Sequence, residues 1–326
     1  MTDPDSFHPR FPWLGGDLQT LRNRFVWRFR PLPGEAQPLR LPLADGTGDA
    51  LTGTLHRPEG EARGPLIVLL HGLTGDAGSA YMVEAAHHHV SRGHIVLRLN
   101  LRGAGSAAET CEGFYSSAHW PDIHAAIAAL DPALTARGVF PVGFSLGGNI
   151  LVNAMARLPE GSPLLGGASV SAPLDPMGAA RRLMHWRNRI YERALLKDMK
   201  AAHRTLPEAR DPAFREQIDA ATSILDFDDR VTAPRTGYAS AAEYYDGNAG
   251  AQVAGAIPVP FLAIHAEDDP WIPPDPYIAL ADAPPPLHIA LTRAGGHVGF
   301  HAAGNPVPWH DRAIAAFIDR LHAAPD

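Results

Sequence analysis

Residues 143–147, Gly-Phe-Ser-Leu-Gly, constrain the fold of this chain more than any other segment, because they set a serine between two glycines. A β-prone run at 139–142 precedes them, and apolar residues at helical spacing follow over 149–158. Side chains in so tight a turn from strand to helix would collide with the neighbouring backbone. The pattern therefore predicts a nucleophile elbow, a strained turn that exposes the hydroxyl of Ser145.

Four apolar runs elsewhere are typical of buried strands that end in polar or glycine-containing loops: residues 65–70, 94–99, 260–266 and 287–292. The first leads into His-Gly at 71–72, the third into two aspartates at 268–269, and the fourth into Gly-Gly-His at 295–297. Serine, acid and histidine thus follow one another in the chain order of the α/β-hydrolase fold. The sequence therefore predicts that fold.

Helical stretches alternate with these runs, near 78–91, 121–130 and 147–158. This alternation predicts a mostly parallel, doubly wound sheet that is covered on both faces. Alternating residues within 38–56 predict an antiparallel hairpin at its edge. The interval between the sixth and seventh core strands is mostly helical and is expected to form an inserted cap. The predicted parts are an N-terminal arm (1–37), a first core part (38–172), the helical cap (173–257) and a second core part (258–326).

In the chemistry that this order predicts, Ser145 attacks an acyl carbonyl while His297 takes its proton and later gives it to the leaving alkoxide. His301 and His310 are rival bases. We favour His297 because the two glycines before it allow a loop to bring the imidazole over the serine, whereas His310 opens a helical pattern over 311–321.

Two backbone N–H groups are expected to stabilise the oxyanion. One belongs to Leu73, just after the His-Gly strand end, and the other to Leu146, the residue after the nucleophile.

The motifs together resemble those of the α/β-hydrolase family that includes bacterial YheT-type hydrolases and the mammalian ABHD1, ABHD2 and ABHD3 proteins. They are spread over nearly the whole chain, at residues 16–20, 71–75, 100–103, 143–149, 227–228, 231–234, 244–245, 268–270 and 295–300. The resemblance implies a serine hydrolase of the carboxylesterase kind. In some relatives the substrates are acyl esters or phospholipids, and in others the acyl group is transferred to an alcohol.

The resemblance also bears on the acid that orients His297. In this fold the acid usually lies just after its strand and before a proline or an apolar pair, as Asp269 does in Asp-Pro-Trp-Ile-Pro. We therefore prefer Asp269. Asp268 stays open as the alternative, because sequence does not orient adjacent residues in an irregular loop.

Composition agrees with a globular enzyme: the 326 residues are 45% hydrophobic and 19% charged, enough for one large domain with an insertion. The net charge of −7, with no basic stripe, argues against nucleic-acid binding. The single cysteine, Cys111, excludes an intrachain disulfide, and no helix or basic neighbour favours its thiolate.

No cofactor or metal is predicted. The loop at 102–106 lacks both the G-x-G-x-x-G spacing and the Walker lysine of nucleotide sites. Three histidines at 87–89 do not converge on one ion, because consecutive helical residues point about 100° apart. The acidic run 226–229 is explained by helix capping and by pairing with Arg230 or Arg235.

The first thirty residues are broken by prolines and charges and do not form a signal peptide. No apolar run approaches the roughly twenty residues that cross a bilayer, whereas the mammalian relatives carry a membrane anchor ahead of the hydrolase domain. We therefore expect a cytoplasmic protein.

Within the predicted cap, residues 181–199 mix apolar and cationic side chains at helical spacing. One interpretation is a lid whose Met, Trp and Leu side chains line an acyl pocket, while its arginines approach an anionic head group or make a peripheral contact with a membrane surface. The alternative is an ordinary cap helix with a solvated face.

The sequence as a whole predicts a cofactor-independent serine hydrolase that cleaves small to medium acyl esters through an acyl-enzyme on Ser145. Alternatives with the same triad are an alcohol acyltransferase and a lipid esterase or phospholipase. A ligand-binding protein without catalysis is the alternative from another class, since the fold alone establishes no activity. Dehalogenase chemistry is disfavoured because it needs a carboxylate at the elbow.

Overall fold

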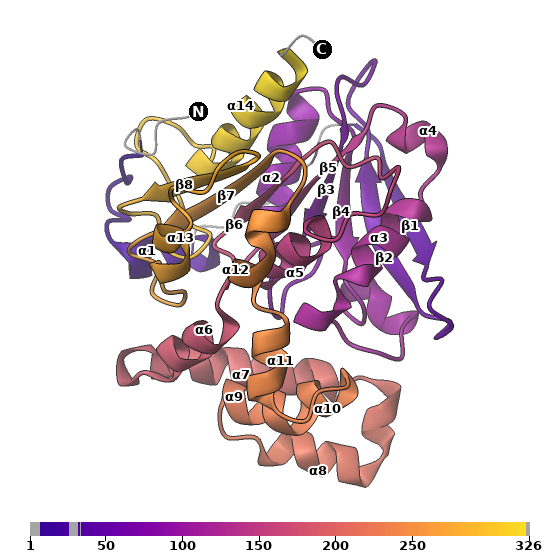
Figure 1. The fold of residues 1–326 in the computed structure, drawn as a ribbon, viewed down its shortest axis with the longest axis vertical. Helices are drawn as coiled ribbons and strands as arrows, with labels where there is room; N and C mark the ends of the chain where they lie inside the picture. The colour runs from indigo at the N-terminus through magenta and orange to yellow at the C-terminus, as the bar shows by residue number, and fades with distance from the viewer. Residues whose placement is uncertain (1–6, 26–31, 33, 324–326) are drawn as a thin grey trace.

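The computed structural model describes residues 7–25, 32 and 34–323. They form an eight-stranded sheet with helices on both faces and a further group of helices beyond the ends of the strands (Figure 1). The strands are β1 (Ala36–Pro42), β2 (Ala50–His56), β3 (Leu66–Leu70), β4 (Val96–Asn100), β5 (Val139–Phe144), β6 (Gly167–Val170), β7 (Phe261–Ala266) and β8 (Leu287–Thr292).

The α-helices are α1 (Gly16–Phe25), α2 (Ala80–Ser91), α3 (Pro121–Ala128), α4 (Pro132–Thr135), α5 (Leu146–Met155), α6 (Pro176–Met184), α7 (Arg189–His203), α8 (Pro212–Ala220), α9 (Ile224–Phe227), α10 (Ala233–Arg235), α11 (Ala241–Gly247), α12 (Gly250–Val253), α13 (Asp275–Ala279) and α14 (Trp309–Ala323). A π-helical turn at Asp228–Thr232 links α9 to α10.

The sheet has the strand order β1-β2-β4-β3-β5-β6-β7-β8. β2 pairs antiparallel with β1 and β4, and the other neighbours are parallel. This confirms the mostly parallel sheet with an antiparallel hairpin at one edge. Parallel strands all end on the same side of the sheet. The loops that follow β3, β5, β7 and β8 therefore converge beyond the carboxyl ends of the strands, where α/β sheets bind ligands.

Two apolar cores cover the two faces of the sheet. One contains Ile123 of α3 and Ile150 of α5, and the other contains Met82 of α2 and Ile314 of α14. Every residue of β3, β5 and β7 is buried between them. This explains why these strands are continuous apolar runs in the sequence rather than alternating ones.

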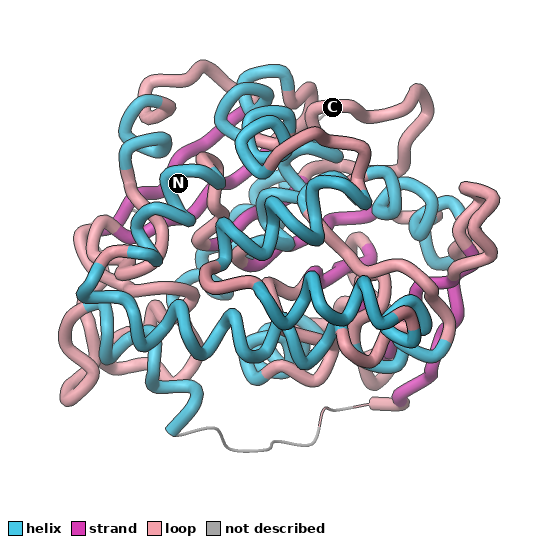
Figure 2. Tube along the Cα trace, turned by 90° about the horizontal axis from the view of Figure 1, so that it is seen from below, coloured by secondary structure: helices cyan, strands magenta, loops and turns pink. Residues whose placement is uncertain are grey.

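The helices between β6 and β7 form the predicted cap (Figures 1 and 2). α7, α8 and α9 share an apolar core of their own around Phe214, Ile218 and Phe227. The last residues of this interval pack against the sheet instead, since Ala254 and Ile257 belong to the apolar core that contains Ile123 and Ile150.

Arg102, in the loop after β4, binds three carboxylates rather than a nucleotide. Its guanidinium lies 2.6 Å from Asp49, 2.6 Å from Asp45 and 2.7 Å from Asp122. These ion pairs join the β1–β2 hairpin to α3, because Asp122 lies in the first turn of that helix.

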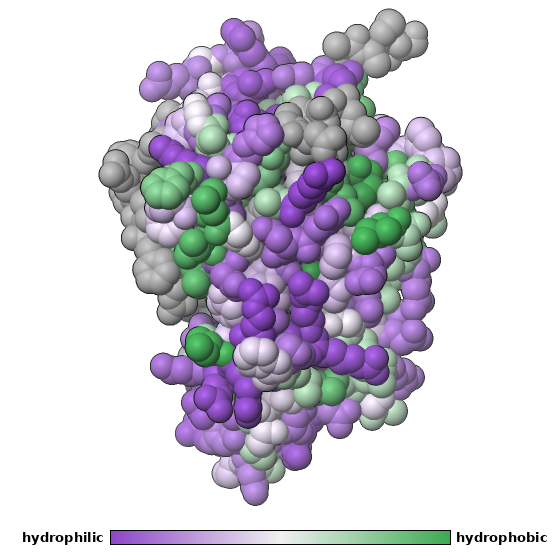
Figure 3. Space-filling view, turned by 90° about the vertical axis from the view of Figure 1, so that its left-hand side faces the viewer, coloured by the Kyte–Doolittle hydropathy of each residue, from purple (hydrophilic) through white to green (hydrophobic). Residues whose placement is uncertain are grey.

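None of the helices in the described ranges has the length and the apolar character needed to cross a bilayer. On the face drawn in Figure 3, hydrophilic side chains predominate and apolar side chains form separate groups.

Candidate active site

Ser145 occupies a strained turn between β5 and α5, with φ 50° and ψ −123°. Its neighbours leave no room for side chains: a Cβ at Gly147 would lie 2.3 Å from the His71 carbonyl oxygen, and one at Gly143 would lie 2.5 Å from the Gly147 carbonyl oxygen. The two glycines are therefore steric requirements of the turn.

Ser145, His297 and Asp269 form one hydrogen-bonded chain, although 152 and 28 residues separate them in the sequence. The imidazole Nε2 of His297 lies 2.9 Å from the Ser145 Oγ, and its Nδ1 lies 2.8 Å from the Asp269 Oδ2. The other carboxylate oxygen of Asp269 accepts the backbone N–H groups of Trp271 at 2.8 Å and Ile272 at 3.0 Å. The carboxylate is thereby fixed in place.

Asp269 is completely buried. Burial alone would raise its pKa, but the adjacent His297 and the hydrogen bonds hold the pKa of this carboxyl below its ordinary value. The group is therefore an anion that faces an imidazole, the arrangement that fixes an imidazole tautomer and stabilises an imidazolium.

The other candidate acid, Asp268, points elsewhere. Its carboxylate accepts the backbone N–H of Gly296 at 2.8 Å and so supports the turn that leads to His297. Burial raises the pKa of Asp268 above its ordinary value. Of the two aspartates, only Asp269 is hydrogen-bonded to His297 among the described residues.

The rival histidines lie outside this chain of contacts. The ring of His301 lies 3.1 Å from the Arg22 guanidinium, and the ring of His310 packs edge-on against Phe144, behind the elbow. Neither residue lines the cavity over Ser145.

Leu73 and Leu146 both line that cavity, and within the described ranges neither backbone N–H donates a hydrogen bond. The turn before Leu73 is held on three sides. The Gly72 N–H donates to the Tyr81 hydroxyl at 2.9 Å, while the Gly72 carbonyl accepts the Tyr115 hydroxyl at 3.1 Å and contacts His71 Nδ1 at 2.9 Å. These contacts fix the orientation of the backbone around the N–H group of Leu73.

His71 can donate to the Gly72 carbonyl because its surroundings fix its tautomer. Its Nε2 accepts the backbone N–H of Leu101 at 3.1 Å, so the proton lies on Nδ1, which donates to Gly72. Burial lowers the pKa of His71 to about 4, which keeps the ring neutral. Sequence reasoning identified the His-Gly strand end but missed Tyr81 and Tyr115, which come from other segments.

The comparisons with known proteins identify the family and the fold of the chain. A family model described as "alpha/beta hydrolase fold" matches residues 65–301. The putative esterase YheT of Escherichia coli is 32% identical over 289 residues, which cover 87% of this chain and 83% of that protein. This chain belongs to the α/β-hydrolase family. The resemblance predicted from the motifs is thereby confirmed.

A yeast monoacylglycerol lipase, from Saccharomyces cerevisiae, is 28% identical over 269 residues. The match covers 79% of this chain but only 60% of the lipase. Among solved structures, a Pyrococcus furiosus esterase, Pf2001, superposes with a TM-score of 0.60 at 17% identity, over 91% of this chain and 95% of that one. At that identity the likeness concerns the fold alone.

In this α/β-hydrolase the N-terminal arm supports the histidine loop. The Thr20 hydroxyl accepts the backbone N–H of His297 at 2.8 Å, and the Gln19 side-chain carbonyl accepts that of His301 at 2.7 Å. A Cβ at Gly16 would overlap the Asp268 carbonyl oxygen, at 1.8 Å. Residues 16–20 were recognised in the sequence only through the family resemblance, because nothing local indicates a partner 277 residues away.

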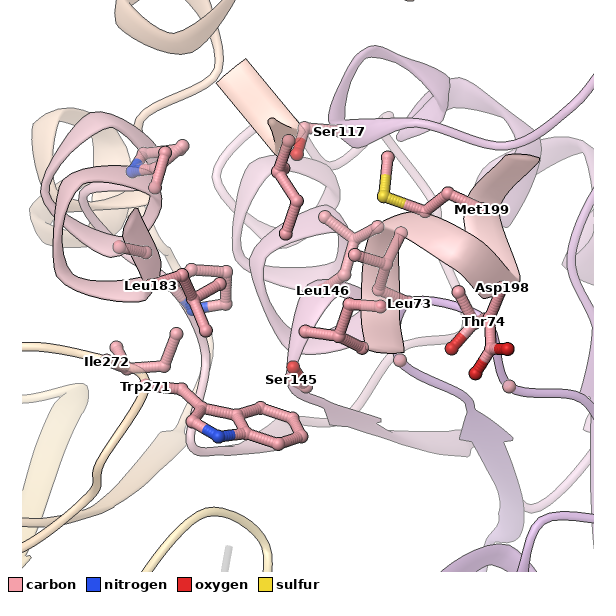
Figure 4. Close-up of a pocket in the computed structure, with 18 of the residues that line it drawn as sticks. Leu73, Thr74, Ser117, Ser145, Leu146, Leu183, Asp198, Met199, Trp271 and Ile272 are labelled. Atoms are coloured by element: carbon pink, nitrogen blue, oxygen red, sulfur yellow. The ribbon is translucent and has the colours of Figure 1, made fainter. Parts of the chain in front are cut away.

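A cavity of about 410 Å³ opens over Ser145, between the core and the cap (Figure 4). Leu73 and Leu146 of the core and Leu183 and Met199 of the cap line it. Trp271 also lines it, and its ring packs against the His297 imidazole at 4.4 Å.

A polar group in the cavity wall comes from the cap. The Asp228 carboxylate accepts the Thr232 hydroxyl at 2.6 Å and the Tyr245 hydroxyl at 2.5 Å. Burial raises the pKa of Asp228 to about 6. The cavity is therefore largely apolar with a smaller number of polar groups in its wall, as small-molecule sites commonly are.

Within the described residues, no cluster of three or more His, Cys, Asp or Glu side chains is arranged to hold a metal ion. Cys111 is buried, and its Sγ donates to the Ala50 carbonyl at 3.2 Å. Burial raises the pKa of this thiol, which disfavours the reactive thiolate.

Proposed function

We propose that this α/β-hydrolase cleaves carboxylic esters through an acyl-enzyme formed on Ser145. The observation that carries the proposal is the 2.9 Å contact between Ser145 Oγ and His297 Nε2 at the base of a largely apolar cavity. A serine hydroxyl is a weak nucleophile unless an adjacent base takes its proton. The buried, anionic Asp269 supports that function of His297, since it stabilises the imidazolium that proton transfer creates.

In the proposed first half-reaction, the Ser145 oxygen adds to the acyl carbonyl as its proton passes to Nε2 of His297. The carbonyl oxygen becomes an oxyanion, which the N–H groups of Leu73 and Leu146 stabilise. The ester C–O bond then breaks, and His297 returns the proton to the departing alkoxide.

In the second half-reaction a water molecule loses a proton to His297 and adds to the acyl carbon. Collapse of this intermediate returns the proton to Ser145 and releases the carboxylic acid. The same acyl-enzyme gives a new ester when an alcohol attacks in place of water.

Two observations support small to medium acyl esters as the substrate class. The cavity volume of about 410 Å³ lies within the usual range of small-molecule sites, and leucine, methionine and tryptophan side chains line much of it. The named activities of YheT and of the yeast lipase, an esterase and a monoacylglycerol lipase, concern esters too.

The test is turnover of p-nitrophenyl esters of graded chain length by the wild-type protein and by Ser145→Ala. We expect turnover that depends on chain length and a loss of about 10⁶-fold in kcat in the variant. Turnover that survives this substitution would overturn the proposal. Absence of turnover with every ester, in folded wild-type protein, would instead favour the ligand-binding alternative.

Product analysis with an added alcohol separates hydrolysis from acyl transfer. A hydrolase gives mainly the free acid when water competes with the alcohol, whereas a transferase gives mainly the new ester.

A further inference from the structure

Exposed apolar side chains are concentrated in two segments that adjoin the active site. The described ranges expose eight large apolar side chains, and six of them lie within residues 11–18 and 184–190. We call these six the rim patch: Phe11, Leu14, Leu18, Met184, Trp186 and Ile190. Scattered single apolar residues are normal on a surface, but such a concentration marks an interaction site.

Specific contacts hold the two segments against each other. The Asp17 carboxylate of α1 lies 2.7 Å from the Arg187 guanidinium and accepts the Tyr191 hydroxyl of α7 at 3.0 Å. Asp17 is next to Leu18 in the chain, and Arg187 is next to Trp186. These contacts hold the arm part and the cap part of the rim patch side by side.

The same two helices line the cavity. Thr20 and Leu21 of α1 and Tyr191 and Ala194 of α7 belong to its wall. Ile190, which precedes Tyr191, is 81% exposed. The exposed apolar surface thus continues into the cavity that holds Ser145.

Cationic groups are concentrated beside the cap part of the patch, in a protein that is acidic overall. Residues 181–193 contain five arginines and one glutamate, whereas the whole chain carries a net charge of −7. Arg182 is used internally, since it donates to the Asp269 carbonyl at 2.8 Å. Arg181, Arg187, Arg189 and Arg193 are exposed.

We propose that the rim patch docks this hydrolase on an anionic lipid surface, with the cavity open toward the lipid. A tryptophan and aliphatic side chains flanked by arginines suit the boundary between head groups and acyl chains. Pairing of the patch with a second copy is disfavoured, because a two-fold contact would bring the arginine segment against itself. Docking would present hydrophobic esters to Ser145 directly from the lipid.

The test is flotation with vesicles of phosphatidylcholine alone and of phosphatidylcholine with one third phosphatidylserine. We expect binding to the second vesicles and weaker binding at high salt. Two double variants should each weaken vesicle binding by at least about tenfold: Trp186→Ser with Ile190→Ser, and Arg189→Glu with Arg193→Glu.

Matched controls lie elsewhere on the surface. Ile278→Ser removes another exposed apolar side chain, and Arg40→Glu with Arg57→Glu reverses two exposed charges on the β1–β2 hairpin and just beyond its end. Both controls should bind as the wild type does. All four variants should keep the wild-type turnover of a soluble short ester.

Flotation is also measured on Ser145→Ala, so lipid binding and catalysis are tested independently. Equal binding to both kinds of vesicle, or full binding by the two rim-patch variants, would overturn the proposal. It would also be overturned if the wild type were a dimer in solution that the Trp186 and Ile190 substitutions dissociate, because the patch would then be a self-interface.

Discussion

The turn that carries Ser145 and the cap that covers it are built under opposite constraints. At the elbow, added Cβ atoms at Gly143 and Gly147 would run into backbone atoms at 2.5 and 2.3 Å. In the cap, a Cβ at Gly247 would instead meet a side chain, the ring of Tyr238 at 2.9 Å. Backbone sterics thus determine the reactive turn, whereas side-chain packing determines the cap.

Buried carboxylates in the two regions also have different partners and opposite pKa shifts. Asp269, in the core, is paired with His297 and has a pKa below its ordinary value. Asp228, in the cap, accepts hydrogen bonds from two hydroxyl groups, and burial raises its pKa to about 6. A neighbouring imidazole favours the charged form, and hydroxyl donors compensate burial only in part.

The largest expected effect lies at the core carboxylate. Asp269→Asn should lower kcat by about 10⁴ while the fold is retained, because the amide favours the wrong tautomer of His297. Asp268→Asn is the matched variant, and it should retain most of the activity because Asp268 bonds Gly296 rather than the imidazole. Steady-state kinetics and circular dichroism check both. If the large loss appeared in Asp268→Asn instead, the assignment of the acid would be wrong.

The second prediction compares a glycine of the elbow with one in open space. Gly147→Ala should destabilise the protein by about 3 kcal/mol or more, because the new methyl group overlaps the carbonyl of His71. Gly255→Ala, in the segment that joins the cap to β7, should change stability by less than about 0.5 kcal/mol, because the new methyl group meets nothing within 4 Å. Urea unfolding of the three proteins gives the values. Similar stabilities for the two variants would contradict the steric requirement at the elbow.

The third prediction concerns pH. A carboxyl group with a raised pKa stabilises the folded state only while it is protonated, so Asp228 loses its contribution as pH rises through about 6. Between about pH 4 and pH 7, Asp228→Asn should therefore gain stability relative to the wild type, by up to about 3 kcal/mol.

For Asp269→Asn the trend should have the opposite sign. The lowered pKa of Asp269 means that its ionised form stabilises the fold, and that this stability is lost as pH falls below the ordinary carboxyl range. Thermal unfolding of both variants across pH measures the two slopes. If the unfolding temperatures of the two variants, relative to the wild type, changed with pH in the same direction, the different environments of these carboxylates would be contradicted.

The smallest expected effect compares two tyrosine hydroxyls. Tyr115→Phe removes a donor to the Gly72 carbonyl, and the loosened turn should lower kcat about tenfold with KM unchanged. Tyr191→Phe, in the cap, loses only a contact with Asp17 and should keep the wild-type kcat. Equal effects in the two variants would show that the Gly72 turn does not depend on Tyr115.

The same contrast explains what could be predicted from the sequence. The elbow and the Gly-Gly-His loop were predictable because they depend on local backbone geometry, which glycine spacing records. Asp269 was preferred to Asp268 only through the family resemblance, since the choice depends on how a loop orients adjacent residues. The supporting contacts of Thr20, Tyr81 and Tyr115 were missed because each joins segments far apart in the chain.

The central claim is that His297 activates Ser145 as a nucleophile, and a fluorophosphonate probe tests it most directly. Such a probe bonds covalently to an activated serine, and peptide mass spectrometry locates the adduct. We predict a single adduct, on the peptide that contains Ser145, and none in Ser145→Ala. No adduct in folded wild-type protein, or an adduct that persists in Ser145→Ala, would contradict the claim.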